Sequence, residues 1–270
     1  MALPTEVASR PFRSAAQHYL AGRPPYPDRL IRRVAQLAGL TASDRVLDLG
    51  CGPAMLAAAF APFAREVVAM DPEPEMLRVA GEAFGHIGNL RLVGGSSDDL
   101  SPNLGEFRLV VMGRSLAWMD RTETLRRLDA MIVPSGAVAL FDTEHPDEVP
   151  DNGWNVRYRA LRHRYGEANA ANTRRHSGGW VCHEAILLAS TFSLLEAAVA
   201  IERRRVGARE LVHRALSMSS SAPDRLGDAA AANLAGEIED LAREFAPDGV
   251  LTEVVETTAL IARREGEGDV

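Results

Sequence analysis

Short apolar runs alternate with helical patterns between residues 44 and 142 of the chain. The runs, among them VLDLG, EVVAMD, FRLVVMG and GAVALFD, each end in glycine or aspartate, and the segments between them space apolar residues as an amphipathic helix does. Strands that alternate with helices form βαβ units, which require a mainly parallel sheet covered by helices on both faces. We therefore expect an α/β fold with its core in residues 44–142.

Residues on either side of this core follow other patterns. Residues 1–43 contain helical patterns at 14–20 and 28–38, which we expect to pack at the edge of the sheet as an N-terminal helical lid. Residues 143–183 are polar, rich in arginine and too long for a plain loop, so we expect an inserted helical cap over the substrate site. Residues 184–270 return to strand and helix patterns and complete the fold.

The charged residues and the cysteines limit the chemistry and the setting. All 30 basic residues are arginine, so the chain has no P-loop lysine, no Schiff-base lysine and no lysine general base. The net charge of −7 argues against a dedicated nucleic-acid-binding protein. Cys51 and Cys182 show neither metal-site spacing nor a disulfide framework, so we expect no metal and a reducing compartment. Without a secretory pattern or a membrane-spanning run, we expect a cytoplasmic protein.

The sequence VLDLGCGPA places an aspartate and two glycines where an apolar strand meets a helix. Gly50 and Gly52 allow a tight turn and a close approach of a ligand to the main chain. A dinucleotide site would have a third glycine at the position of Met55, and Asp48 would repel its phosphates. S-adenosylmethionine carries no phosphate, and Asp48 would attract its sulfonium and ammonium groups. Asp71 ends the next strand, where a carboxylate can accept both hydroxyls of a ribose, so the spacing favours S-adenosylmethionine.

These segments resemble those of the class I S-adenosylmethionine-dependent methyltransferases, and within them the small-molecule enzymes of the ubiquinone-biosynthesis and trans-aconitate methyltransferase type. The resemblance covers most of the chain and is densest over residues 19–142. VLDLGCGPA is similar to the glycine-rich loop, MDPEPEML to the ribose-binding segment, GGSSDDL to the adenine segment and GRSLAWMD to the exit of the fourth strand. It implies a Rossmann-like, doubly wound, mainly parallel sheet of seven strands. It also implies S-adenosyl-L-methionine as cofactor and S-adenosyl-L-homocysteine as product, held by Asp48, Gly50, Cys51, Gly52, Asp71, Pro72, Met76, Ser96, Ser97, Asp98, Arg114 and Ser115.

Three positions depart from the family pattern. The adenine segment usually begins with a carboxylate, which is Ser96 here, so adenine recognition would rest more on backbone and hydroxyl groups. At the exit of the fourth strand, Arg114 replaces a glutamine and Ala117 replaces a histidine. Any role that this histidine has in relatives is therefore absent.

The proline-rich segment GRPPYP precedes the first predicted strand. Its prolines favour an extended segment ahead of the helix near Asp28 and hold Arg23 and Tyr26 at low entropic cost. In the family an RPxYP segment closes over the cofactor, so the resemblance implies that Arg23, together with Tyr19, binds the methionine carboxylate. The alternative is a helix entry with a surface arginine.

The candidate catalytic residues are His145, which follows a strand at the ligand-binding edge of the sheet, and Tyr26. A base is optional, because methyl transfer from a sulfonium depends mainly on alignment and on exclusion of water, and a carboxylate acceptor needs none. The insert is rich in arginines that either form a solvated face or hold a carboxylate or phosphate of the substrate. They are Arg157, Arg159, Arg162, Arg164, Arg174 and Arg175.

The sequence thus predicts an enzyme that methylates an oxygen or nitrogen nucleophile of a small molecule. One alternative is an RNA or protein methyltransferase that docks its target on the arginine-rich insert. A second is a cofactor-binding protein of this fold without transferase activity. The sequence names neither the acceptor nor the oligomeric state.

Overall fold

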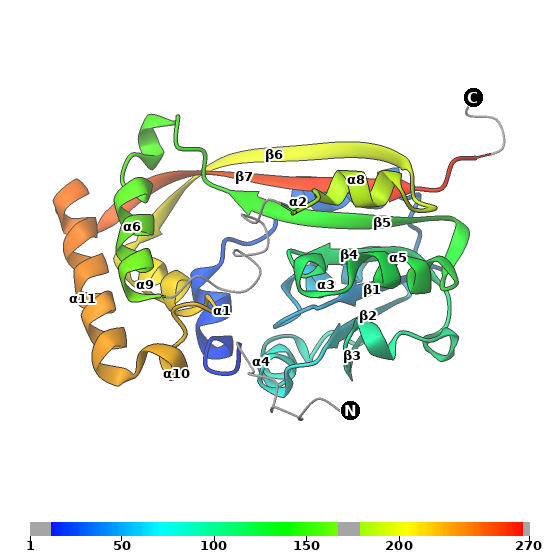
Figure 1. The fold of residues 1–270 in the computed structure, drawn as a ribbon, viewed down its shortest axis with the longest axis horizontal. Coiled ribbons are helices and arrows are strands. Elements are labelled where there is room, and N and C mark those ends of the chain that lie inside the picture. Colours follow the sequence, from blue (N-terminus) through cyan, green and yellow to red (C-terminus); the bar gives the residue numbers. More distant parts are fainter. Residues whose placement is uncertain (1–11, 167–178, 267–270) are drawn as a thin grey trace.

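The computed structural model describes residues 12–166 and 179–266 (Figure 1). Within them one sheet has the strand order β3-β2-β1-β4-β5-β7-β6. Its strands are β1 (Arg45–Leu49), β2 (Glu66–Asp71), β3 (Leu90–Gly94), β4 (Phe107–Gly113), β5 (Ile132–Glu144), β6 (Leu194–Gly207) and β7 (Val250–Arg263). Neighbours from β3 to β5 pair in parallel, and β7 is antiparallel to both β5 and β6. The predicted α/β fold with a mainly parallel seven-stranded sheet is confirmed.

Helices cover both faces of the sheet, as alternating side chains of one strand show. Val46 of β1 faces a core shared with α2 and α3, whereas Leu47 and Leu49 face a core shared with α5 and α8. The helices of the described residues are α1 (Ala16–Gly22), α2 (Asp28–Leu37), α3 (Met55–Phe60), α4 (Pro74–Phe84), α5 (Arg121–Asp129), α6 (Asn155–Tyr165), α8 (His183–Leu188), α9 (Ala208–Leu216), α10 (Pro223–Leu226) and α11 (Asp228–Phe245).

The strand order changes direction between β1 and β4. The chain runs outward through β2 and β3 on one side of this point and through β5 on the other. In open α/β sheets the crevice at such a point, outside the carboxyl ends of the strands, is where ligands bind. The carboxyl ends of β1 and β4 are Leu49 and Gly113, which places the glycine loop after β1 at this crevice.

A second group of helices lies at the left of Figure 1, beside the half of the molecule that contains the glycine loop. Helix α6, from the predicted cap, shares a hydrophobic core with α9 and α11, which lie in the predicted C-terminal part. Two buried aromatic residues tie α6 to its neighbours: Trp154 Nε1 donates to the Thr252 carbonyl at 2.9 Å, and the Tyr158 hydroxyl donates to the Leu211 carbonyl at 2.8 Å. Strands β5, β6 and β7 are long and run from this helical group to the other end of the molecule (Figure 1).

The two N-terminal helices take different places. Helix α2 packs against the sheet beside β6 and β7, as predicted. Helix α1 packs instead against α9, which corrects the prediction that both lie at the sheet edge. The contact is close because Gly22 lies directly on the backbone of Arg214, and the Nδ1 atoms of His18 and His213 are 2.9 Å apart.

Gly22→Ala should therefore loosen the docking of α1. An added Cβ would lie 2.3 Å from the Arg214 backbone nitrogen, so one of the two helices must move. Overpacking of this kind costs about 1–3 kcal/mol, which should lower the midpoint of urea unfolding. The matched control is Gly236→Ala in α11, where an added Cβ meets no atom within 4 Å and should stabilise the helix by up to about 1 kcal/mol. Equal midpoints for the two variants would contradict the close packing of Gly22.

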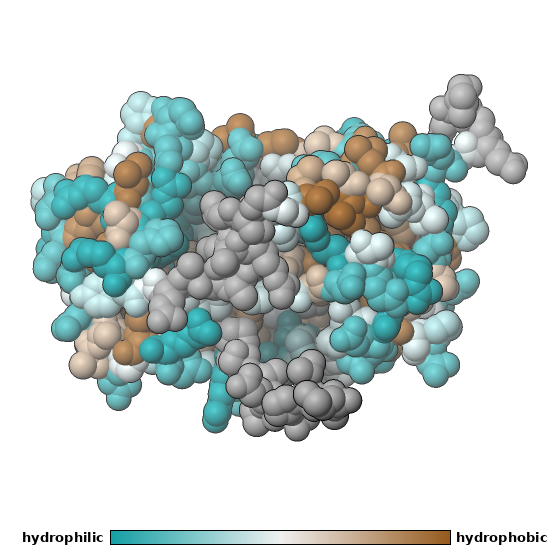
Figure 2. All heavy atoms as spheres, viewed as in Figure 1, coloured by the Kyte–Doolittle hydropathy of each residue, from teal (hydrophilic) through white to brown (hydrophobic). Residues whose placement is uncertain are grey.

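The surface is mostly polar on the face shown in Figure 2, and a compact apolar area lies over α8. Leu188 at the end of α8 is 58% exposed and Val181 just before it is 44% exposed. Among the helices in residues 12–166 and 179–266, none has the length and apolar character needed to cross a bilayer.

Candidate active site

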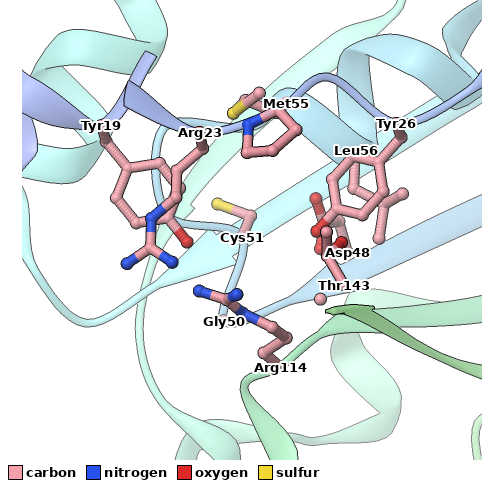
Figure 3. Close-up of a pocket in the computed structure, with 12 residues that line it drawn as sticks. Tyr19, Arg23, Tyr26, Asp48, Gly50, Cys51, Met55, Leu56, Arg114 and Thr143 are labelled. Carbon is pink, nitrogen blue, oxygen red and sulfur yellow. The ribbon is translucent and has the colours of Figure 1, made fainter. Parts of the chain in front are cut away.

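A pocket opens at the crevice predicted by the strand order, between the sheet and α1 (Figure 3). It encloses about 500 Å³ of empty space, part of which is open to solvent. Its walls come from the segment after α1, the glycine loop and the carboxyl ends of β4 and β5. The lining residues are Tyr19, Arg23, Pro24, Tyr26, Asp48, Gly50, Cys51, Met55, Leu56, Gly113, Arg114 and Thr143.

The glycine loop forms the floor of the pocket. Gly50 and Gly52 have φ values of 70° and 55°, which glycine adopts without strain. A Cβ on Gly50 would lie 2.5 Å from the Cβ of Ser115, so a side chain could not be accommodated there. The N–H groups of Gly50 and Cys51 both donate to the Met70 carbonyl, at 2.8 and 3.0 Å, which fixes the loop against β2. The loop is therefore shaped before any ligand binds.

Asp48 is the buried acid of this floor. Its Oδ2 accepts a hydrogen bond of 2.9 Å from the Ala57 N–H, while its Oδ1 has no hydrogen-bond partner within the described residues. Burial raises the pKa of Asp48 to about 8, against the lowering effect of the Ala57 hydrogen bond and with a smaller contribution from Asp71. A buried carboxyl oxygen without a partner favours a ligand that brings a positive charge or a donor.

Asp71 fastens the glycine loop to the start of α4. Its Oδ2 accepts from the Gly52 N–H at 2.8 Å and its Oδ1 accepts from the Glu73 N–H at 2.9 Å. Burial raises the pKa of Asp71, although these two hydrogen bonds oppose the shift. Each oxygen keeps a second lone pair, which could accept a ribose hydroxyl.

Two further residues predicted to bind the cofactor, Met76 and Pro72, lie near the junction of the glycine loop and α4. Met76 is buried in α4, and its Sδ lies 3.9 Å from where a Cβ of Gly52 would be, so it packs directly behind the loop. Pro72 is exposed. Neither belongs to the lining of the pocket.

The predicted adenine segment is shaped by its own hydrogen bonds. Ser96 caps a short 3₁₀ helix, η2 (Ser97–Asp99), because its hydroxyl accepts from the Asp98 N–H at 3.2 Å while Asp99 Oδ2 accepts from the Ser96 N–H at 2.8 Å. Arg127 donates to the carbonyls of Ser97 and Asp98. The Ser96 hydroxyl thus forms the turn, and all three predicted residues lie outside the pocket lining. The spacing Ser-x-x-Asp is a capping-box signal that sequence reasoning had missed.

Arg114 and Ser115 leave β4 in opposite directions. The Ser115 hydroxyl donates to the Leu49 carbonyl at 2.6 Å and so holds the end of β1 instead of facing the pocket. Arg114 has a φ of 60°, unusual for a residue with a side chain, and its guanidinium reaches into the pocket (Figure 3). Burial would lower the pKa of Arg114, but Tyr19, Asp142 and Tyr26 outweigh it and raise the pKa.

Arg23 and Tyr19 extend from α1 into the same space (Figure 3). Arg23 Nε donates to the Ser217 hydroxyl at 2.9 Å, and its Cζ lies 4.9 Å from the centre of the Tyr19 ring. Burial, followed by repulsion from Arg114, lowers the pKa of Arg23 to about 9. The guanidinium is therefore held in place without a neutralising carboxylate within the described residues, which suits it to an anionic ligand.

Tyr26 and Cys51 keep their protons. The Tyr26 ring packs edge-on against Phe141 at 5.5 Å, and its hydroxyl lies 2.4 Å from where a Cβ of Gly113 would be. Burial raises the pKa of Tyr26 well above its usual range, and burial likewise raises the pKa of the Cys51 thiol. Tyr26 is a hydrogen-bond donor to the pocket and is poorly suited to act as a base.

His145 is not brought to the pocket. It follows β5 as predicted, but its Nε2 lies 3.0 Å from Glu253 Oε2 and 3.1 Å from Arg214 Nη1, in a buried cluster between β7 and α9. Met55, Leu56 and Thr143, which line the pocket, were not among the residues predicted from the sequence. Thr143 could have been found from its place at the carboxyl end of β5.

Comparison with known proteins agrees with this geometry. Residues 46–136 match a family model described as a methyltransferase domain. An uncharacterized methyltransferase of Mycobacterium tuberculosis is 30% identical over 129 residues, which is 48% of this chain and 50% of the relative. A demethylmenaquinone methyltransferase of Staphylococcus carnosus is 28% identical over 120 residues, 43% of this chain and 49% of the relative. The chain thus spans about half the length of the curated relatives it matches.

Solved structures share the fold over nearly the whole chain. A putative type II methyltransferase from Anaeromyxobacter dehalogenans superposes with a TM-score of 0.60 at 18% identity, covering 90% of this chain and 97% of that one. A S-adenosylmethionine-dependent methyltransferase from Geobacter sulfurreducens, solved with S-adenosyl-L-homocysteine, gives a TM-score of 0.53 at 13% identity over 95% and 98% of the two chains. With the strand order, these likenesses show that the chain has the fold of S-adenosylmethionine-dependent methyltransferases, within which residues 46–136 match a methyltransferase domain.

Proposed function

We propose that this protein transfers a methyl group from S-adenosylmethionine to an oxygen or nitrogen nucleophile of a small molecule in the cytoplasm. The observation that carries the proposal is the buried Asp48 oxygen, which has no hydrogen-bond partner in residues 12–166 and 179–266 and lies at the floor of a pocket formed by the glycine loop. A ligand that is cationic near this oxygen and anionic near Arg23 fits the charges of the pocket. The methionine part of S-adenosylmethionine carries both kinds of charge, with a sulfonium at one end and an ammonium and a carboxylate together on the α-carbon at the other.

The residues suited to hold the cofactor follow from these charges. Asp48 would attract the cationic groups, Arg23 would bind the carboxylate, and the backbone of Gly50 and Gly52 would allow close approach. Asp71 offers its remaining lone pairs to a ribose. When bound, the cofactor supplies a methyl group on a positively charged sulfur, which becomes a neutral thioether after transfer.

The protein contributes positioning more than proton transfer. Tyr26 and Cys51 stay protonated, and His145 lies outside the pocket. Tyr19, Tyr26 and Leu56 form aromatic and aliphatic walls that limit the access of water to the space above the loop. Alignment of the nucleophile with the methyl group in this pocket can lower the barrier without a base.

Cofactor affinity should rise with pH up to about pH 8. Below the pKa of about 8, Asp48 is mostly protonated and cannot attract a cation, so affinity falls by up to tenfold per pH unit as the pH decreases. Calorimetric titration with S-adenosylmethionine at pH 6, 7 and 8 measures this. Asp48→Asn should keep only the pH dependence that comes from the cofactor's own amine, so the difference between the two proteins isolates the contribution of Asp48. Parallel pH profiles for the two proteins would contradict the role of Asp48.

A two-step experiment tests the function itself. Calorimetry with S-adenosylmethionine and S-adenosyl-L-homocysteine asks whether the pocket binds the cofactor. A methyl-transfer screen over carboxylates, phenols, amines, RNA and protein then asks which acceptor leads to release of S-adenosyl-L-homocysteine. Absence of cofactor binding would overturn the proposal. Transfer to RNA or protein alone would replace the small-molecule acceptor, and binding without any transfer would indicate a cofactor-binding protein.

A further inference from the structure

The arginines in the described part of the insert mostly form ion pairs at the surface, as a solvated face would. The pairs are Arg157 with Glu244, Arg159 with Asp147 and Arg164 with Glu237. Arg162 lies against the Tyr158 ring, and Arg174 and Arg175 lie outside the described residues. Arg23 in the pocket differs from the paired arginines, because its side chain donates to a neutral residue, Ser217.

Ser217 directly follows α9 and holds the guanidinium of Arg23 along one edge. Arg23 Nε donates to the Ser217 hydroxyl at 2.9 Å, and Arg23 Nη2 donates to the Ser217 carbonyl at 3.3 Å. Nε and Nη2 lie on the same edge of the planar guanidinium, so the two contacts fix its orientation as a pair. Ser217 is fully buried and is not part of the lining of the pocket, so its effect on a ligand would pass through Arg23.

The Ser217 hydroxyl is itself fixed in direction. It donates its proton to the Arg214 carbonyl at 2.8 Å, which leaves its lone pairs for Arg23. The Ser217 carbonyl lies at the carboxyl end of α9, where carbonyl groups lack intrahelical partners and the helix dipole is negative. Both oxygens are therefore well-placed acceptors for a cation.

The same turn of α9 also holds the main chain just ahead of Arg23. Arg214 Nε donates to the Gly22 carbonyl at 3.0 Å, and Gly22 lies directly on the Arg214 backbone. Arg214 is anchored in turn by the buried Glu253, through contacts of 2.7 and 2.9 Å. The backbone that leads into Arg23 and the side chain of Arg23 are thus attached to the same turn of one helix.

These contacts leave the other edge of the guanidinium for a ligand. A guanidinium has five N–H groups, and Ser217 accepts one from Nε and one from Nη2, which leaves both on Nη1 and one on Nη2. Nη1 and Nη2 together can bind a carboxylate through two parallel hydrogen bonds. The Tyr19 ring supports the guanidinium, with its centre 4.9 Å from Cζ. Arg23 is therefore oriented before a ligand arrives.

We propose that Ser217 is a positioning residue for the cofactor: it orients Arg23 so that Nη1 and Nη2 meet the carboxylate of the methionine part. The inference rests on the proposed function, in which Arg23 binds that carboxylate. A freely rotating arginine would lose side-chain freedom when the ligand binds, whereas a guanidinium already held by Ser217 loses little. Ser217 therefore raises affinity for ligands that carry this carboxylate and leaves the affinity for other ligands unchanged.

Two ligands that differ in the amino-acid part test this selectivity. S-adenosyl-L-homocysteine carries the carboxylate, whereas methylthioadenosine keeps the adenosine and the thioether but lacks the carboxylate and the ammonium group. Ser217→Ala should weaken binding of S-adenosyl-L-homocysteine by about threefold to tenfold, the range expected when one long side chain must be ordered upon binding. Binding of methylthioadenosine should change by less than about twofold. Calorimetric titration measures both affinities.

The matched control is Ser219→Ala. Ser219 is buried in the same segment, and its hydroxyl has no hydrogen-bond partner within residues 12–166 and 179–266, so its removal should change neither affinity. Ser217→Cys keeps the size of the side chain but offers only a weak acceptor, and it should show the same selective loss as Ser217→Ala. In an Arg23→Ala background, Ser217→Ala should cause no further loss, because the group that it positions is gone.

The outcomes separate the inference from the proposed function. Equal weakening of both ligands by Ser217→Ala and Ser217→Cys would mean that Ser217 only supports the fold, with Arg23 as a cap of α9, and would overturn the inference. So would unchanged affinity for S-adenosyl-L-homocysteine, or a further loss in the Arg23→Ala background. If the unmodified protein binds no S-adenosyl-L-homocysteine, the proposed function fails instead. A thermal unfolding midpoint close to that of the unmodified protein shows that a variant is folded.

Discussion

Asp71→Ala is expected to weaken binding of S-adenosylmethionine by at least a hundredfold. The substitution removes both acceptors that tie the Gly52 loop to the start of α4, at 2.8 and 2.9 Å, and with them the lone pairs available to a ribose. Hydrogen bonds to a charged group contribute about 1.5–3 kcal/mol each, so losing two exceeds the 2.7 kcal/mol of a hundredfold change. The variant would therefore lose both the hydrogen bonds that hold the loop in shape and the acceptors for the ribose hydroxyls.

Calorimetric titration measures the effect, and Asp44→Ala is the matched control. Asp44 lies just before β1, and its carboxylate accepts from the N–H and the hydroxyl of Thr41 near the surface, so truncation of its side chain should leave cofactor affinity unchanged. Circular dichroism shows whether Asp71→Ala is still folded. A dissociation constant within threefold of the unmodified protein would show that Asp71 neither shapes the loop nor binds the cofactor.

Glu253→Ala is expected to destabilise the fold by about 3–5 kcal/mol. Glu253 is fully buried in β7, and its carboxylate pairs with Arg214 at 2.7 Å and with His145 at 3.0 Å. Truncation leaves the buried Arg214 guanidinium without its closest carboxylate, and Glu210, which also pairs with Arg204, then compensates its charge only in part in a region of low dielectric. Urea unfolding measures the loss. The control is Glu237→Ala, which breaks the exposed pair with Arg164 and should cost less than 1 kcal/mol.

Glu253 is also expected to contribute to the loss of stability at low pH. Burial alone would raise the pKa of Glu253, but hydrogen bonds from His145 and Arg214 outweigh it and lower the pKa to about 2. Because the folded pKa lies below the ordinary value of 4.5, the stabilisation is complete above about pH 4.5 and is lost as the pH falls toward 2. Glu253→Gln should show a flatter loss of stability over this range. An equally steep loss would mean that other carboxyl groups govern acid unfolding.

The sheet and the glycine loop could be predicted because their signals are local. Each strand of the first five is a short apolar run that ends near a glycine or an acid, and Gly50 and Gly52 adopt the positive φ values of the turn without strain. Tyr19, Arg23 and Tyr26 were also predicted to lie at the site, Arg23 and Tyr26 from the stiff segment GRPPYP and Tyr19 from the family resemblance, and all three line the pocket. Local backbone preference and side-chain spacing are enough for such features.

The docking of α1 and the place of His145 could not be predicted in this way. Gly22 contacts Arg214, and His145 contacts Glu253, so each depends on a partner far along the chain that no periodic pattern identifies.

The long strands β5, β7 and β6 restrict how far the walls of the pocket can move when a ligand binds. Both walls of the pocket are attached to one continuous pleated surface. Thr143 lies at the end of β5, and α1, which carries Tyr19, packs against α9, which in turn contacts β6. A hinge between the two walls would have to break the hydrogen-bonded ladder of these strands. The width of the pocket is therefore set when the chain folds, and binding should cost little reorganisation of the backbone.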